Sequence, residues 1–188
     1  MKKKVLIITY YWPPAGGPGV QRWLKFVKYL RDFDIEPIVF IPENPNYPII
    51  DSELQKDINS NTIIIKNPIS EPYKLASIFS KKTTKTISSG IIPNKKKQSF
   101  LDKFLLYVRG NFFIPDARIA WVKPSVSVLE NYIKEHPVDL IITTGPPHSW
   151  HLIGLELKNK LNCKWFADFR DPWTSIGYHK QLKLTERS

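Results

Sequence analysis

The alternation of short apolar runs with helix-like segments is the feature that most limits the possible folds. Residues 4–9 (KVLIIT) are almost uninterruptedly apolar, as expected of a strand buried on both faces of a sheet. Residues 20–30 then place apolar side chains at helical spacing, and residues 35–41 (IEPIVFI) predict a second strand. A strand, a helix and a second strand in this order make a βαβ unit, which predicts a parallel sheet.

The last third of the chain repeats this plan. Residues 138–143 (VDLIIT) predict a strand, residues 149–161 a helix and residues 164–169 (KWFADF) a further strand. Another short strand is expected at residues 62–66, and an amphipathic helix at residues 124–135. The predicted fold class is therefore α/β. We expect one Rossmann-like, three-layer domain with a mostly parallel sheet, because 188 residues leave room for one compact domain.

Cysteine content and hydropathy exclude several classes of protein. Cys163 is the only cysteine, which excludes an internal disulfide and a cysteine-based metal cluster. No run approaches the roughly 20 apolar residues that cross a bilayer. The apolar patch near the start is too short for a signal peptide. These features favour a cytoplasmic protein.

The net charge of +11 is concentrated in one segment. Between Lys74 and Arg109 there are nine Lys or Arg residues and one acid, Asp102, which gives +8 and leaves +3 for the rest of the chain. Residues 74–98 are polar and basic, and their weak hydrophobic pattern predicts a mobile segment.

The basic segment suggests a partner for the chain. The lysines of Lys81–Lys97, beside a helix-like segment at residues 99–109, suggest contact with an anionic membrane surface. A solvated loop beside an ordinary packed helix explains the same residues. A nucleic-acid-binding module is disfavoured, because Lys81–Lys97 lacks interleaved aromatic residues and no reader motif occurs.

Three loops with chemically active residues follow predicted strands. Ligands of open parallel α/β sheets bind outside the carboxyl ends of the strands, so we expect these loops to converge. The loops lie at residues 10–19, 143–149 and 168–173, and their candidate residues are Gly16, Gly17, Gly19, His148, Asp168, Arg170 and Asp171.

The glycine loop, YYWPPAGGPGVQR, is compatible with several structures. Its glycines allow a ligand to approach closely, and the following helix offers N–H groups to a phosphate. Pro18 removes one of these donors, and the Gly-Lys-Ser/Thr ending of a P-loop is missing. The glycines come later than in a dinucleotide fingerprint, although Glu43 resembles its ribose-binding acid. A rigid turn between strand and helix is the structural alternative.

The other two loops also have a structural and a functional interpretation. His148 is able to bind a diphosphate oxygen or a sugar hydroxyl, and capping of the following helix by His148 or Ser149 is the structural alternative. His151 lies one turn later, and two histidines without a third ligand do not predict a metal site. Arg170 is suited to phosphate or carboxylate, and Asp168 or Asp171 to a hydroxyl group. An internal Arg–Asp ion pair that locks the turn is the alternative.

The motifs together resemble the N-terminal domain of a GT-B-fold glycosyltransferase, of the large retaining group that uses nucleotide-sugar donors. The matching pieces are KVLIITYYWPPAGGPGVQRWLKFVKYL, IPDARIAWVKP, VDLIITTGPPHSWHLIGLELKNKL and KWFADFRDPW. The resemblance covers most of the chain outside residues 74–98. It implies that residues 1–188 form one half of a GT-B fold. It also implies that the donor-binding C-terminal domain lies outside this chain, and we therefore expect the fragment to be inactive alone.

The resemblance also implies roles for individual residues. The nucleotide sugar is a substrate, so no cofactor and no metal ion are expected, and the acceptor is a glycan or a lipid-linked molecule. Arg170 stands where many relatives have a histidine, and Asp171 follows it. The expected catalytic residues are Arg170, Asp171 and His148, the donor diphosphate-binding residues Gly16, Gly17 and Gly19, and the acceptor-binding residues Tyr10, Tyr11, Trp12 and Asp168.

Two other functions are weighed against this one. They are a dinucleotide-binding oxidoreductase domain, which would use the glycine loop with Glu43, and the basic nucleic-acid-binding module. The expected location of the glycosyltransferase is the cytoplasm, with peripheral contact to the inner face of the plasma membrane.

Overall fold

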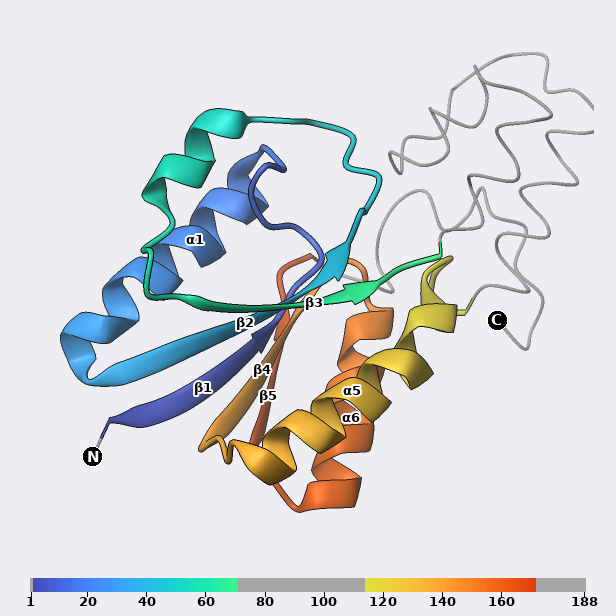
Figure 1. Cartoon of the computed structure of the whole chain (residues 1–188). Coiled ribbons are helices and arrows are strands. Elements are labelled where there is room, and N and C mark those ends of the chain that lie inside the picture. Colours follow the sequence, from blue (N-terminus) through green and yellow to red (C-terminus); the bar gives the residue numbers. More distant parts are fainter. Residues whose placement is uncertain (1, 71–113, 172–188) are drawn as a thin grey trace, which may run out of the picture.

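The described part of the chain is built around one parallel β-sheet. The computed structural model describes residues 2–70 and 114–171. Five strands lie in the order β3-β2-β1-β4-β5, and each neighbouring pair is parallel (Figure 1). The strands are β1 (Lys3–Ile8), β2 (Ile35–Glu43), β3 (Ile63–Pro68), β4 (Leu140–Gly145) and β5 (Trp165–Phe169).

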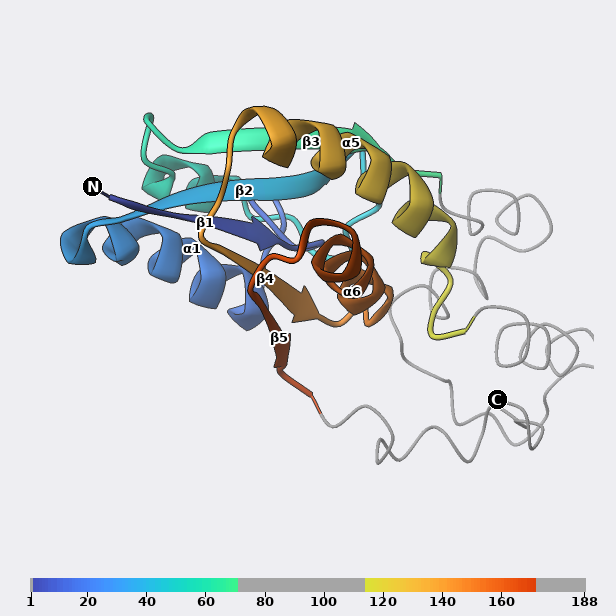
Figure 2. The ribbon, with the colours of Figure 1, turned by 90° about the horizontal axis from the view of Figure 1, so that it is seen from below.

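Helices cover both faces of the sheet. Helix α1 (Pro18–Leu30) packs on one face, whereas α5 (Val122–Glu135) and α6 (Ser149–Leu161) pack on the other (Figure 2). This is an α/β, Rossmann-like arrangement, and it confirms the predicted fold class. Within the described residues, short 3₁₀ helices lie at Arg31–Phe33, Ser52–Asp57 and Ile119–Trp121.

The central strand β1 contributes to a core on each face of the sheet. Leu6 and Ile8 belong to the core beneath α5 and α6, and Val5 and Ile7 belong to the core beneath α1. Consecutive side chains of a strand point to opposite faces. A strand covered on both faces therefore needs apolar residues at successive positions, which explains the unbroken apolar run in the sequence.

Three stacked aromatic rings join the sheet to its helices on the α5–α6 side. Trp121 stacks on Phe40 of β2, with ring centroids 5.0 Å apart, and on Trp150 of α6 at 4.6 Å. All three side chains are buried. The indole Nε1 of Trp121 donates to the carbonyl oxygen of Pro68 at 2.9 Å, which satisfies its polar group inside the core.

The observed elements agree with the predicted ones apart from their ends. The helix predicted at residues 149–161 spans those residues as α6. The helix predicted at residues 20–30 begins earlier, at Pro18, because a proline is well suited to the first helical position. The strand predicted at residues 138–143 is shifted and begins at Leu140.

Several predictions concern residues that the structure does not describe. The basic segment at residues 74–98 and the helix predicted at residues 99–109 both lie outside the described residues. Within the described residues, none of the helices has both the length and the apolar character needed to cross a membrane.

A carboxylate from a distant part of the chain caps α6. Asp116 accepts a hydrogen bond from the backbone N–H of Ser149 at 2.8 Å and another from its hydroxyl at 2.9 Å. The N-cap residue, His148, makes no such bond with its own side chain. The prediction that His148 or Ser149 caps this helix is therefore wrong. A carboxylate also suits this position because it opposes the partial positive charge of the helix N-terminus.

Asp116→Ala is expected to lower the free energy of unfolding by about 1 kcal/mol, within the roughly 0.5–2 kcal/mol typical of a lost N-cap. Urea denaturation followed by circular dichroism measures this change. Glu53→Ala is the control, because Glu53 is an exposed carboxylate paired only with a surface lysine, Lys56, among its side-chain contacts. An equal loss of stability in the two variants would contradict the capping role of Asp116.

Candidate functional site

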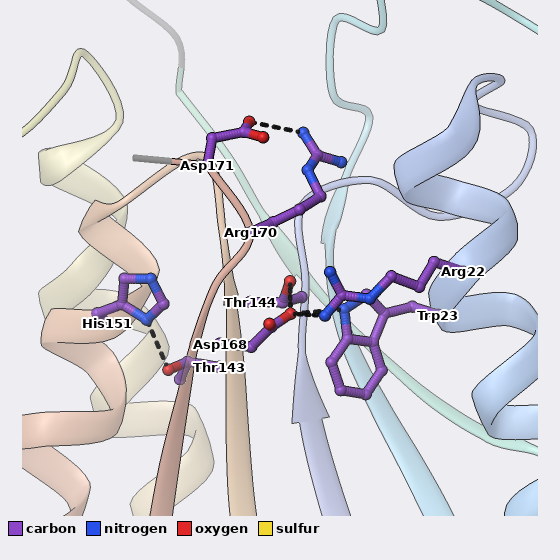
Figure 3. Close-up of polar contacts among 8 residues, drawn as sticks. All are labelled: Arg22, Trp23, Thr143, Thr144, His151, Asp168, Arg170 and Asp171. Carbon is purple, nitrogen blue, oxygen red and sulfur yellow. Dashed lines mark hydrogen bonds and ion pairs between the residues drawn. The ribbon is translucent and has the colours of Figure 1, made fainter. Parts of the chain in front are cut away.

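The loops after β1, β4 and β5 come together at the carboxyl edge of the sheet. Thr144 of β4 donates to Asp168 of β5 at 2.8 Å, and Arg22 of α1 forms an ion pair with the same carboxylate (Figure 3). Arg170, just after β5, lies against Gly19 in the first turn of α1. The convergence predicted for these three loops is therefore observed.

The glycines of the first loop are required for different reasons. An added Cβ at Gly16 would stand 2.9 Å from Cγ2 of Ile49, so this glycine allows the loop to pack on the segment after β2. An added Cβ at Gly19 would overlap Nη1 of Arg170. Gly17 has a φ of 106°, which only glycine adopts without strain, and an added Cβ there would meet no atom within 4 Å. Of the three, Gly17 is the glycine that borders open space.

The N-terminus of α1 is a positively polarised surface. Gly17 occupies the N-cap position and has no side-chain acceptor. Pro18 has no N–H, and the N–H of Val20 donates to the carbonyl oxygen of Gly17 at 3.2 Å. Among the described residues, the N–H of Gly19 is therefore the donor left in the first turn. The guanidinium of Arg170 lies against the same turn, and its Nη2 donates to Asp171 at 3.1 Å. Helix N–H groups and an arginine side by side are a suitable arrangement for an anion such as phosphate.

Asp168 connects three elements through one oxygen atom. Its Oδ2 accepts hydrogen bonds from the guanidinium of Arg22, from Nε1 of Trp23 at 3.2 Å and from the hydroxyl of Thr144 at 2.8 Å (Figure 3). Burial raises the pKa of Asp168, but the hydrogen bonds from Arg22, Thr144 and Trp23 outweigh this effect. The pKa therefore lies below its usual value, and the carboxylate is ionised at neutral pH.

The structural alternative for this turn, an internal Arg–Asp ion pair, is observed between Arg170 and Asp171. Asp168 pairs with Arg22 of α1. The sequence does contain one hint of the contact between Asp168 and Arg22. Arg22 lies at the start of the first helix and Asp168 near the end of a strand, where the loops were predicted to converge. The residues of this network that sequence reasoning missed are Arg22, Trp23 and Thr144.

His148 and His151 lie side by side at the start of α6, on the other side of β5. They are 7% and 6% exposed, and the ring of Phe169 packs on both, with ring centroids 5.8 and 4.0 Å away. Burial and the neighbouring His148 lower the pKa of His151 to about 4, so its imidazole is neutral at neutral pH. Within residues 2–70 and 114–171, no three His, Cys, Asp or Glu side chains gather as metal ligands.

The three aromatic residues expected at the acceptor differ in exposure. Tyr10 and Trp12 are 0% and 1% exposed and belong to opposite cores of the sheet. The guanidinium of Arg118 lies 4.3 Å from the ring centre of Tyr10, and Tyr11 packs edge-to-face on that ring at 4.8 Å. Tyr11 is half-buried and is the member with exposed surface. The role of these residues in acceptor binding stays a prediction.

Comparisons with known proteins identify no family for this chain. Neither the protein-family models nor the curated proteins give a match. Among solved structures, the C-terminal domain of a hydrogenase from Pyrococcus furiosus is 15% identical, with a TM-score of 0.44 over 89% of this chain and 91% of that one. Apo UGT2 from Phytolacca americana, a UDP-glycosyltransferase, is 11% identical, with a TM-score of 0.44 over 88% of this chain and 28% of that one. Similarities of this size establish no activity.

Asp168→Asn is expected to lower the free energy of unfolding at neutral pH by about 1.5–3 kcal/mol, the range for hydrogen bonds to a charged group. The folded pKa of Asp168 lies below the unfolded value of about 4. The stabilisation is therefore present above about pH 4 and is lost as the pH falls through the folded pKa. Urea denaturation at a series of pH values measures the difference between wild type and variant, which should shrink in acid.

Asp57→Asn is the matched control for this experiment. Asp57 also pairs with basic side chains, Lys25 and Lys28, but these are exposed at the protein surface. Exposed ion pairs contribute little, so the control variant should lose well under about 1 kcal/mol. A difference between wild type and Asp168→Asn that stays constant from neutral to acidic pH would show that the ionised carboxylate is not the stabilising group.

Proposed function

We propose that this chain is the acceptor-side, N-terminal domain of a GT-B-fold glycosyltransferase, which moves a sugar from a nucleotide-sugar donor to a glycan or lipid-linked acceptor. The observation that carries the proposal is the uncapped N-terminus of α1 beside Arg170. It lies at the carboxyl edge of a parallel sheet, where α/β domains bind phosphate-containing ligands. A donor-binding domain outside this chain is part of the proposal.

In this proposal the donor diphosphate lies at Gly17 and Arg170. Gly17 lets the ligand approach the backbone, where, among the described residues, the N–H of Gly19 is the donor left in the first turn of α1. When the bond between the sugar and the diphosphate breaks, negative charge accumulates on the departing diphosphate. The guanidinium of Arg170 stabilises this charge, and Asp171 orients the guanidinium through their hydrogen bond.

The N-terminus of α6 is less suited to a phosphate than that of α1. The carboxylate of Asp116 already accepts hydrogen bonds from the backbone and side chain of Ser149 there. A bound anion would have to displace this carboxylate or lie next to it. His148, the N-cap residue of α6, is the proposed catalytic group that acts on the acceptor hydroxyl.

A dinucleotide-binding oxidoreductase domain is the second candidate function. Glu43 lies exposed at the carboxyl end of β2, next to the strand that leads into the glycine loop. This is where an acid binds the ribose hydroxyls of a dinucleotide in Rossmann domains. The two candidates differ in their ligand, because only the dinucleotide needs Glu43.

The proposed location is the cytoplasm, with peripheral contact between Lys81–Lys97 and an anionic membrane. Liposome flotation with and without anionic lipid tests this part of the proposal. Electrostatic attachment should weaken as salt is added.

Calorimetric titration of the full chain with inorganic pyrophosphate tests the donor site. We expect saturable binding that weakens with added salt. Arg170→Gln removes charged hydrogen-bond donors, so the affinity should fall about tenfold or more. Arg31→Gln is the control, because it changes the same charge at the other end of α1 and should leave the affinity nearly unchanged.

The outcomes of this titration separate the candidates. Absence of pyrophosphate binding, or equal effects of Arg170→Gln and Arg31→Gln, would contradict the proposed donor site. Titration with NADH addresses the alternative. Tight NADH binding that is weakened by Glu43→Gln, without binding of nucleoside diphosphates, would favour the oxidoreductase.

A further inference from the structure

A chain of hydrogen bonds links Trp165, Thr143 and the ring of His151. The indole Nε1 of Trp165 donates to Oγ1 of Thr143 at 2.9 Å, because an indole N–H can only donate. The same Oγ1 lies 2.9 Å from Nδ1 of His151. The hydroxyl hydrogen of Thr143 is then available to Nδ1 of a neutral imidazole. The tautomer in which this hydroxyl donates to Nδ1 carries its proton on Nε2, and the ligand site proposed here depends on that tautomer.

The Nε2 atom of His151 is a buried ring nitrogen with no hydrogen-bond partner among the described residues. His151 is only 6% exposed. A buried N–H without a partner costs free energy, and such groups are rare in native proteins. Holding an N–H of His151 buried without an acceptor therefore costs free energy in the folded state.

The backbone at Gly145 leaves just enough room for the ring of His151. An added Cβ at Gly145 would stand 2.8 Å from Nε2 of His151 and 2.9 Å from Nδ1 of His148, so a larger residue at the end of β4 would displace both rings. The ring of Phe169 packs on His151 with centroids 4.0 Å apart and is itself 51% exposed. An exposed aromatic ring thus covers a buried donor, at the edge of the sheet where ligands bind.

We propose that Nε2 of His151 and the ring of Phe169 form a binding site for an uncharged, hydroxyl-bearing ligand, namely the sugar of the acceptor. This inference rests on the proposed glycosyltransferase function. A sugar hydroxyl accepts the hydrogen bond from Nε2, and the apolar C–H face of the sugar packs on the phenyl ring. The side chain of Phe169 turns aside from Nε2 when the ligand enters.

The ligand is uncharged because the imidazole is neutral. Burial and the neighbouring His148 lower the pKa of His151 to about 4, so the ring carries no charge to offer a phosphate. A neutral N–H donor is instead well suited to a hydroxyl oxygen. The anion site at Arg170 and the sugar site at His151 therefore have different chemistry.

Nitrogen NMR of the histidine rings of the full chain tests the proposal. We expect His151 to be neutral and protonated on Nε2 at neutral pH. Addition of neutral methyl glycosides, as a panel of common hexoses, should shift the His151 Nε2 resonance saturably with at least one of them, whereas inorganic phosphate should not. His136, which is exposed at the C-terminus of α5, serves as the reference in the same spectra.

Two variants of Thr143 separate a positioning role from a structural one. Thr143→Val keeps the shape but removes the hydroxyl, so His151 should populate the Nδ1-protonated form and glycoside binding should weaken about tenfold. Thr143→Ser keeps the hydroxyl and should retain both properties. If Thr143→Val fails to fold, the wild-type spectra still decide the question.

Two results would overturn the inference. One is wild-type His151 protonated on Nδ1, and the other is the absence of a His151 shift with every glycoside, as expected if Nε2 binds only water. Neither result depends on pyrophosphate binding at Arg170. The proposed sugar site can therefore be refuted without refuting the proposed donor site, and the reverse.

Discussion

The carboxylate of Asp168 joins the end of β5 to the end of β4 and to α1, through hydrogen bonds that meet on one oxygen atom. A largely buried charge of this kind is tolerated because several donors replace its water. The contact with Arg22 holds the first turns of α1 against β5. Arg170, two residues after Asp168, is thereby placed on Gly19, and the glycine loop acquires its position in the site.

Helices α1 and α6 both begin at this edge of the sheet, but within the described residues only α6 has a side-chain carboxylate bonded at its N-terminus. At α6 the chain supplies its own carboxylate, Asp116, which satisfies the N–H and the hydroxyl of Ser149. At α1 the N-cap is Gly17, which offers no side-chain acceptor. A helix N-terminus favours negative charge in either case. An internal carboxylate provides it for α6, and in the proposed function a ligand diphosphate provides it for α1.

The sequence was sufficient for the fold because the fold follows from periodic signals. The apolar run of β1 and the helical spacing of α6 are local patterns, and the parallel arrangement of strands predicts that their loops converge. The partners inside the site were not predictable in this way. Arg22 reaches Asp168 across 146 residues of sequence, and the contact depends on how α1 packs on the sheet. The burial of Tyr10 likewise depends on its neighbours in space.

The alternation of side chains along β5 separates the two kinds of chemistry. Consecutive residues of a strand face opposite sides of the sheet. Asp168 accordingly faces α1 and its arginine, whereas Phe169 faces α6 and the two histidines. One face of the strand end thus holds the ion pair of Asp168 and Arg22, and the other holds a neutral imidazole and an aromatic ring. In the proposed function, a charged leaving group and an uncharged acceptor have to come together, and the end of β5 would lie between their two sites.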